Sequence, residues 1–258
     1  MFEGWFPNPD GSFSLLFGYF NRNLKEEVDI PVGPNNRIEP GGPDRGQPTH
    51  FLPGRMWGNF TIKVPSGFGT AKLTWTIVAN GKTTVIPASL KADWQLAPFI
   101  DAISNTPPFL SFESFDRSGP MVQGPRGLSV SREAKVGQPL PLTVWAADDD
   151  VRSPGARAVK SPVSITWSVF RGPGPVTFAE IKPPVEKIEK SEKIEGKLPP
   201  KTAFAAKAST TATFHTPGEY TLQVVANDAS GDGGAGFQCC WTTAQMKVFV
   251  AAAPGGGQ

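Results

Sequence analysis

Hydrophobic and polar residues alternate with period two through much of this chain. The pattern is clearest in residues 12–21, where Phe13, Leu15, Phe17 and Tyr19 fall on one side. Successive side chains of a strand point to opposite faces of its sheet, so this pattern predicts a strand with one buried face. Residues 57–64 and 73–79 alternate in the same way. The chain is therefore expected to be built from strands.

Turn sequences separate the alternating runs of the N-terminal part. Asn8-Pro9-Asp10-Gly11 precedes the first run, and Asn80-Gly81 follows residues 73–79. Asn-Gly between alternating runs is the strongest short-range signal of a hairpin. Residues 34–54 are rich in Gly, Pro and Asn, which favours a long ordered loop or an irregular edge. We predict that residues 1–92 form one antiparallel β-sandwich domain.

A second domain is expected from 127 to 250. Residues 93–126 show no sustained period and contain Pro107-Pro108, so they are interpreted as a linker packed on the surface. The strands predicted for the second domain cover residues 128–131, 140–147, 163–170, 211–214, 220–226 and 246–250. The fold class predicted for the chain is all-β, with two antiparallel β-sandwich domains.

Two segments of the C-terminal half do not fit this strand pattern. Residues 181–201 alternate Lys and Glu between two Pro-Pro pairs, which predicts either a short solvated helix or, in preference, a mobile excursion from a loop. Residues 251–258 are of low complexity and are expected to form a flexible tail.

Composition narrows the classes of partner. The 258 residues include 28 Gly and 27 Pro without a triplet period, which is typical of many turns between many strands. The formal net charge is only +2, and no basic stripe interleaved with aromatic residues occurs, so no nucleic-acid partner is expected. No run of about 18 apolar residues is present, so no transmembrane segment is predicted.

Three stretches of the second domain form a recognisable pattern: residues 136–148, the Trp-containing strand Ile165 to Val169, and residues 213–222, which include Phe214, Pro217-Gly218 and Tyr220. In these stretches the domain resembles the PKD family of immunoglobulin-like β-sandwich modules. The resemblance implies an immunoglobulin-like fold and an extracellular or cell-surface location, and it is nearly silent on function. Residues 1–6 lack a secretion signal, so we expect a secreted, periplasmic or cell-surface protein whose signal has been removed.

Acidic residues follow two strands of the second domain. Strands two and six of an immunoglobulin-like sandwich run in the same direction, so the loops after them are expected to meet at one pole. Five carboxylates would gather there, and Ca²⁺ prefers oxygen ligands. The alternative, which we prefer, is that these residues only shape turns by bonding their own backbone. The candidate calcium ligands are Asp148, Asp149, Asp150, Asp228 and Asp232.

Cys239 and Cys240 are the only cysteines. Neighbours on a regular strand point to opposite faces, so a bond between them requires a distorted turn. Structural thiols, a vicinal disulfide, and a bond to a partner chain or a redox role all stay open. Zinc needs about four ligands, and His50 and His215 are far apart in sequence, so a zinc site is not expected.

Aromatic and basic residues outside the predicted core are the candidate binding groups. Trp and Arg are enriched at the centres of protein interfaces, and an exposed Trp can also stack on a sugar ring. The candidate binding residues are Trp57, Arg55, Arg45, His50 and Trp241.

No motif in the sequence supports catalysis. It contains no nucleophile elbow, phosphate loop or dinucleotide fingerprint, and nothing singles out a pair of carboxylates. We therefore predict a non-enzymatic, extracytoplasmic structural or interaction protein. No cofactor is expected other than the candidate calcium ion. The protein would act as an accessory subunit or a surface-assembly module through its loops and sheet edges. A carbohydrate-binding module using exposed aromatic loop residues is the alternative.

Overall fold

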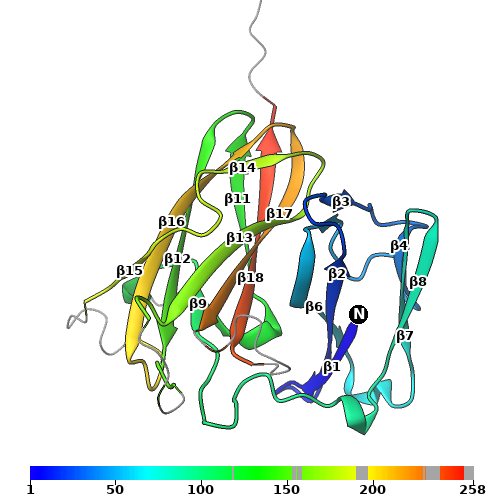
Figure 1. Ribbon diagram of the computed structural model, residues 1–258, viewed down its shortest axis with the longest axis horizontal. Coiled ribbons are helices and arrows are strands. Elements are labelled where there is room, and N and C mark those ends of the chain that lie inside the picture. The colour runs from blue at the N-terminus through cyan, green and yellow to red at the C-terminus, as the bar shows by residue number, and fades with distance from the viewer. Residues whose placement is uncertain are drawn as a thin grey trace, which may run out of the picture. The chain divides into compact units, whose positions relative to one another are not determined.

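The computed structural model describes residues 1–117, 119–152, 155, 159–189, 197–228, 230 and 239–252. The chain divides into two compact units, Met1–Ala97 and Pro98–Gln258. Both are built from strands, which confirms the predicted all-β fold class, and Figure 1 shows them by strand label. Among the described residues, no helix is long and apolar enough to cross a membrane.

The N-terminal unit contains two three-stranded antiparallel sheets. One has the order β1-β2-β6 and the other β4-β7-β8, while β3 pairs with β5. The strands are β1 Phe2–Pro7, β2 Phe13–Asn21, β3 Val28–Asp29, β4 Asn36–Glu39, β5 His50–Phe51, β6 Gly54–Val64, β7 Leu73–Ala79 and β8 Lys82–Ala88, and the 3-10 helices are η1 Ser66–Phe68 and η2 Ala92–Trp94.

Aromatic rings join the sheets of the N-terminal unit. Trp75 of β7 is 1% exposed and meets Phe17 of β2 and Phe60 of β6 edge to face, at 5.9 and 5.1 Å between ring centroids. The rings of Phe17 and Phe60 stack on each other at 5.1 Å. Edge-to-face contact suits the charge distribution of aromatic rings. The alternating residues of the sequence therefore become the inner faces of this sandwich.

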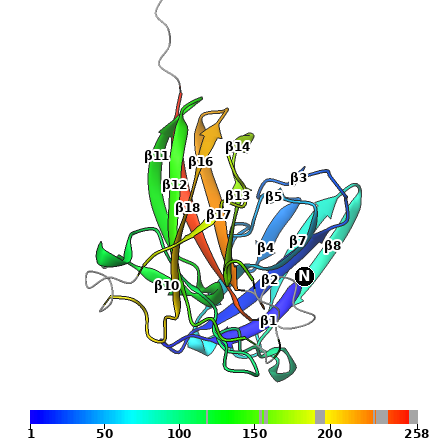
Figure 2. The same ribbon diagram turned by 60° about the vertical axis from the view of Figure 1, so that its left-hand side comes forward.

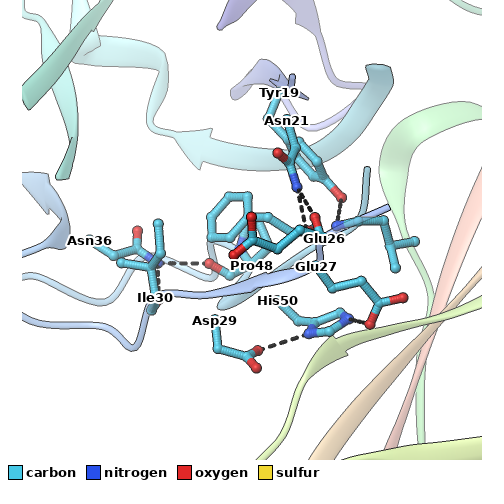
Figure 3. A network of polar contacts seen from close by, with 11 residues as sticks. Tyr19, Asn21, Glu26, Glu27, Asp29, Ile30, Asn36, Pro48 and His50 are labelled. Carbon is cyan, nitrogen blue, oxygen red and sulfur yellow. Dashed lines mark hydrogen bonds and ion pairs between the residues drawn. The ribbon is translucent and has the colours of Figure 1, made fainter. Parts of the chain in front are cut away.

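The segment 34–54, expected as a loop or irregular edge, carries two short strands around a buried amide. The Asn36 side chain is fully buried, and its Nδ2 donates to the carbonyls of Ile30 and Pro48 at 2.9 and 2.8 Å. Its Oδ1 accepts from Nε1 of Trp75 at 3.0 Å. Figure 3 shows how Asn36 ties these two backbone positions together. One polar side chain thus orders a Gly- and Pro-rich segment that has few ladder hydrogen bonds of its own.

The C-terminal unit has two larger sheets. One has the order β10-β9-β12-β16-β14, with β15 also on β16, and the other has the order β11-β18-β17-β13. The strands are β9 Phe109–Ser111, β10 Met121–Gln123, β11 Ser129–Lys135, β12 Pro139–Asp148, β13 Val163–Arg171, β14 Val176–Phe178, β15 Val185–Lys187, β16 Phe204–Phe214, β17 Gly218–Asp228 and β18 Trp241–Ala251, and the 3-10 helices are η3 Phe115–Arg117 and η4 Gly124–Arg126.

This strand order is that of an immunoglobulin-like sandwich. β12, β16 and β14 lie in one sheet, and β13, β17 and β18 in the other, with β11 parallel to β18. Trp167 on β13 is fully buried. The hydroxyl of Tyr220, near the start of β17, donates to the carbonyl of Thr216 at 2.9 Å, as in the tyrosine corner of such domains. The predicted immunoglobulin-like architecture is confirmed at this level.

The predicted linker, residues 93–126, differs from the structure. Its C-terminal part carries β9 and β10, and β9 pairs with β12 through Ser111, Leu110 and Phe109. Pro98 onward therefore belongs to the C-terminal unit rather than to a linker. These strands have only three residues each, which is too short for a period-two pattern to emerge from the sequence.

The charged excursion, residues 181–201, is structured in part. β15 pairs with β16 through Val185, Glu186 and Lys187, and Lys207 forms an ion pair with Glu186 at 3.1 Å. Residues 190–196 lie outside the described residues, as do residues 253–258 of the expected tail.

Candidate functional site

Arg55, which is half-buried, and Trp57, which is exposed, form a pair near the start of β6 in the N-terminal unit. Cζ of Arg55 lies 3.8 Å from the centroid of the Trp57 ring, within the range of a cation–π contact. The Trp57 side chain stays 49% exposed. Two of the predicted binding residues are therefore joined into one surface feature, which we call the Arg55–Trp57 pair.

A buried carboxylate holds this pair in place. Glu3 on β1 is only 5% exposed, and its Oε1 accepts from Nη2 of Arg55 at 2.5 Å. Its Oε2 accepts from the backbone N–H of Gly58 at 2.7 Å. Burial raises the pKa of Glu3, and the Gly58 hydrogen bond and the Arg55 charge oppose that shift. The guanidinium is thus fixed on one side by Glu3, while its carbon lies over the indole.

The Glu3 side chain needs the space left by Gly18 of β2. A Cβ added at Gly18 would overlap Oε1 of Glu3 and the backbone oxygen of Met56. The lack of a side chain at position 18 therefore permits the buried carboxylate to reach Arg55. The sequence did not point to Glu3 or Gly18, because no local pattern links Glu3 to Arg55, 52 positions away, or marks Gly18 as the residue that leaves room for the carboxylate.

Gly18→Ala is expected to lower the free energy of unfolding by about 2 kcal/mol, because a backbone oxygen must move to admit the methyl group. Urea denaturation of the full chain measures the change. Gly67→Ala is the matched control, since its Cβ would enter open space, and it should leave stability nearly unchanged. Equal stability of both variants would contradict the proposed fit.

His50 and Arg45 make contacts of their own. Nδ1 of His50 lies 2.8 Å from Oδ1 of Asp29, and Nε2 lies 3.1 Å from Oε2 of Glu27. Figure 3 shows the imidazole held between these two carboxylates. Arg45 donates from Nη1 to the carbonyl of Pro40 at 3.0 Å.

Within the part of the chain that the structure describes, the polar contacts of His50 and Arg45 are with Glu27, Asp29 and Pro40, not with the Arg55–Trp57 pair. Of the four binding residues predicted in this unit, Arg55 and Trp57 are the two in direct contact with each other. The other two side chains stabilise the segment between β3 and β6 instead.

Trp241 does not fit the role predicted for it. It is the first residue of β18 and only 5% exposed, so its ring is not accessible to a sugar or a partner. It also belongs to the other compact unit. The sequence placed Trp241 next to a Gly-rich stretch and suggested a loop, whereas the strand already begins at this residue.

The acidic residues of the C-terminal unit lie around one pole of its sandwich, and each described member already has a partner. Asp148 and Asp228 are 3% and 5% exposed. Asp149 Oδ2 accepts from Oγ1 of Thr106 at 2.8 Å, and Asp150 Oδ1 forms an ion pair with Arg152 at 2.6 Å. Asp232 lies outside the described residues.

These contacts are mostly those of turn-forming residues. Oδ1 of Asp148 accepts from the N–H of Asp150 at 2.8 Å, and Oδ1 of Asp228 accepts from the N–H of Ser230 at 2.7 Å. Among the residues that the structure describes, no group of three or more His, Cys, Asp or Glu residues is arranged to hold a metal ion.

Asp148 is nevertheless electrostatically unusual. Its pKa is raised to about 7, chiefly by burial; the hydrogen bond from the Asp150 N–H opposes this rise, and the charges of Asp228, Asp149 and Asp150 add to it. Its Oδ2 is buried and has no hydrogen-bond partner among the described residues. The predicted meeting of these two loops therefore produces a pair of close, buried carboxyl groups.

Cys239 and Cys240 form a vicinal disulfide, the second of the three alternatives left open by the sequence. Both residues are buried, at 4% and 0% exposed, and Sγ of Cys240 lies 3.7 Å from the carbonyl oxygen of Asn105. Asn105 in turn donates from Nδ2 to Oδ2 of Asp228 at 2.5 Å. The disulfide is thus part of the same buried pole as the acidic pair.

Comparisons with known proteins give no family. No family model matches the chain, and no curated protein matches it. Among solved structures, cadherin-like domains 1 to 4 of zebrafish RET are 9% identical with a TM-score of 0.30, covering 90% of this chain and 47% of that one. S-layer protein SbsC domains 4 and 5 are 12% identical with a TM-score of 0.24, covering 93% and 82%. An endo-fucoidan hydrolase of glycoside hydrolase family 107 is 11% identical with a TM-score of 0.28, covering 89% and 24%. The chain is thus assigned to the all-β class by its own strand order.

Proposed function

We propose that this chain is a non-enzymatic interaction module that acts outside the cytoplasm, as an accessory subunit or as part of a surface assembly. Its loops and sheet edges would present binding groups to a protein partner or to further copies of the chain. We also retain the PKD-like assignment of the C-terminal unit as a proposal, which the Trp167 strand and the Tyr220 corner support.

The observation that carries the proposal is the Arg55–Trp57 pair. Trp57 presents an exposed indole beside Arg55, and Trp and Arg are enriched at the energetic centres of protein interfaces. Glu3 fixes Arg55, and Arg55 lies over the ring, so both groups are held before a partner arrives. Such preorganisation reduces the entropy lost on binding.

Trp57→Ala is expected to weaken partner binding by about thirtyfold or more, because truncating a central interface Trp removes about 2 kcal/mol or more. The full chain, immobilised and exposed to envelope and secreted fractions of the source organism, would capture the partner for measurement of its Kd. Trp94→Ala is the matched control, since Trp94 is also an exposed Trp of the same unit, at 46%. Equal capture by Trp57→Ala and the wild type would contradict the proposal.

A carbohydrate-binding module is the second candidate, favoured by the same exposed ring of Trp57. A glycan array distinguishes the two candidates. Binding to a glycan that is lost in Trp57→Ala and retained in Trp94→Ala would replace the protein-interaction proposal by the carbohydrate one.

A further inference from the structure

On the outer face of the sheet β11-β18-β17-β13, Phe249 is an exposed aromatic ring among mainly polar neighbours. Along β18, Met246, Val248 and Val250 are buried, whereas Lys247, Phe249 and Ala251 are exposed. Phe249 is 48% exposed, whereas Met246, Val248 and Val250 pack in the core of the unit. Figure 2 shows β11 and β18 in the sheet that carries this face.

Two carboxylates bracket this ring. Glu133 of β11 is paired with Phe249 on one side, and Glu219 of β17 is paired with Phe249 on the other. Directly opposite residues of neighbouring strands have their Cβ atoms about 5 Å apart on the same face. Glu133, Phe249 and Glu219 therefore form a row across three strands, which we call the Glu-Phe-Glu row.

The row lines a groove of about 730 Å³ in the C-terminal unit. Its walls also include Lys135 of β11, Gln138 before β12 and Pro139, the first residue of β12. Both Glu133 and Glu219 are exposed, and neither forms an ion pair with another of the described residues. The groove is thus lined by two acidic residues, one aromatic residue and one lysine.

The two carboxylates and the aromatic ring of the row favour a cationic group as the ligand. Arginine is planar, stacks on aromatic faces and donates to carboxylates, so it can contact all three members of the row at once. Lys247 and Lys135 lie on the same outer face, but in other rows: Lys247 is opposite Ser131 and Thr221, and Lys135 is opposite Ala251. The groups directly beside the ring are both acidic.

We propose that the Glu-Phe-Glu row is a docking site for an arginine side chain of a partner protein. The partner lies on the sheet face rather than extending the sheet at β11, because that edge strand carries Arg132, Glu133 and Lys135, and charged side chains on an edge oppose strand addition. This site lies in the C-terminal unit and is independent of the function proposed for the Arg55–Trp57 pair.

The test uses the full-length ¹⁵N-labelled chain and the heptapeptide acetyl-GSGRGSG-amide, followed by amide chemical shifts. We expect saturable shifts around Glu133, Glu219 and Phe249 with a Kd in the millimolar range, about that of a single side chain. The same peptide with citrulline, the neutral isostere of arginine, should produce no saturable shift. Equal shifts with both peptides would overturn the proposal.

Variants make the test specific. The double substitution Glu133→Gln and Glu219→Gln should weaken binding by about fivefold, and Phe249→Ala by about threefold. Glu180→Gln and Ile181→Ala remove an exposed carboxylate and an exposed apolar side chain elsewhere in the same unit, and should leave the Kd unchanged.

Two results identify another occupant and would overturn the proposal. If the arginine peptide binds only after removal of residues 253–258, the chain's own tail occupies the groove. If light scattering shows an oligomer of the wild type that Phe249→Ala dissociates, a second copy of this chain occupies it. The Trp57→Ala variant should retain peptide binding, so this proposal and the one on Arg55–Trp57 fail separately.

Discussion

Asn36→Ala is expected to lower the free energy of unfolding of the N-terminal unit by about 4 kcal/mol. The substitution removes a fully buried amide and leaves three buried groups without their partner: the carbonyls of Ile30 and Pro48, and Nε1 of Trp75. Each unsatisfied group costs about 1–3 kcal/mol. Hydrogen exchange of peptides covering β4 and β7 under native conditions measures the opening free energy within this unit.

Asn35→Ala is the control for this prediction, because Asn35 is the neighbouring residue and its side chain is exposed. It should change the opening free energy by less than about 0.5 kcal/mol. Asn36→Asp keeps the acceptor for Trp75 but buries a carboxylate against two carbonyl oxygens, so it should destabilise the unit at least as much as Asn36→Ala. A loss below about 1 kcal/mol in Asn36→Ala would show that water or a shift of the segment replaces the three bonds.

The second large effect is a loss of stability of the C-terminal unit as pH rises. Asp148 titrates near 3.8 when unfolded and at about 7 when folded. Between these values the folded state binds a proton that the unfolded state has released, so the stability that Asp148 contributes is fully present below pH 3.8 and is lost as pH rises through about 7. The full difference is worth at most about 4 kcal/mol, of which about 3 kcal/mol falls between pH 5 and pH 8.

Asp148→Asn removes this titration, so the stability difference between the variant and the wild type should change by about 3 kcal/mol between pH 5 and pH 8. Urea denaturation at several pH values gives the slope, and Glu180→Gln should retain the wild-type slope. A wild type whose stability is flat or increases over this range would disprove the assignment to Asp148.

Calcium at this pole stays a prediction from the sequence, and the same experiment addresses it. A bound cation would hold Asp148 ionised and would stabilise the fold at high pH. Calcium that raises stability at pH 8 in the wild type, and has no effect in Asp148→Asn, would support the ion. Oδ2 of Asp148, which has no hydrogen-bond partner within the described part of the chain, is the atom that an ion or a proton would satisfy.

The local pattern of the sequence was sufficient for the strands and their class. Alternation around Trp75 followed by Asn80-Gly81 predicts the hairpin β7-β8, which the structure has at Leu73–Ala79 and Lys82–Ala88. The second domain's strands were predicted within a few residues at most ends, although β16 and β18 begin seven and five residues earlier than predicted. The spacing of apolar residues and the residues that form turns are local features of a few neighbouring positions, so a single sequence is enough to recognise them.

The polar contacts that position the candidate sites depended on the tertiary structure. Glu3 meets Arg55 across 52 positions, and Asn105 meets Asp228 across 123. No local pattern marks such pairs, because each arises when two strands or loops become neighbours in space. For the same reason the sequence could not show that His50 contacts Glu27 and Asp29 or that Arg55 contacts Glu3.

Alternation alone also cannot say which aromatic residues stay exposed. Phe249 lies on the outer face because it is out of phase with Met246, Val248 and Val250, which the sequence already contains. That Glu133 and Glu219 lie on either side of it follows only from the pairing of three strands that are distant in the chain. The burial of Trp241 and the exposure of Trp57 likewise depend on which segments pack beside each of them. The sequence by itself determined which residues form strands, whereas the register between strands, set by the packing of the whole unit, decided which side chains meet.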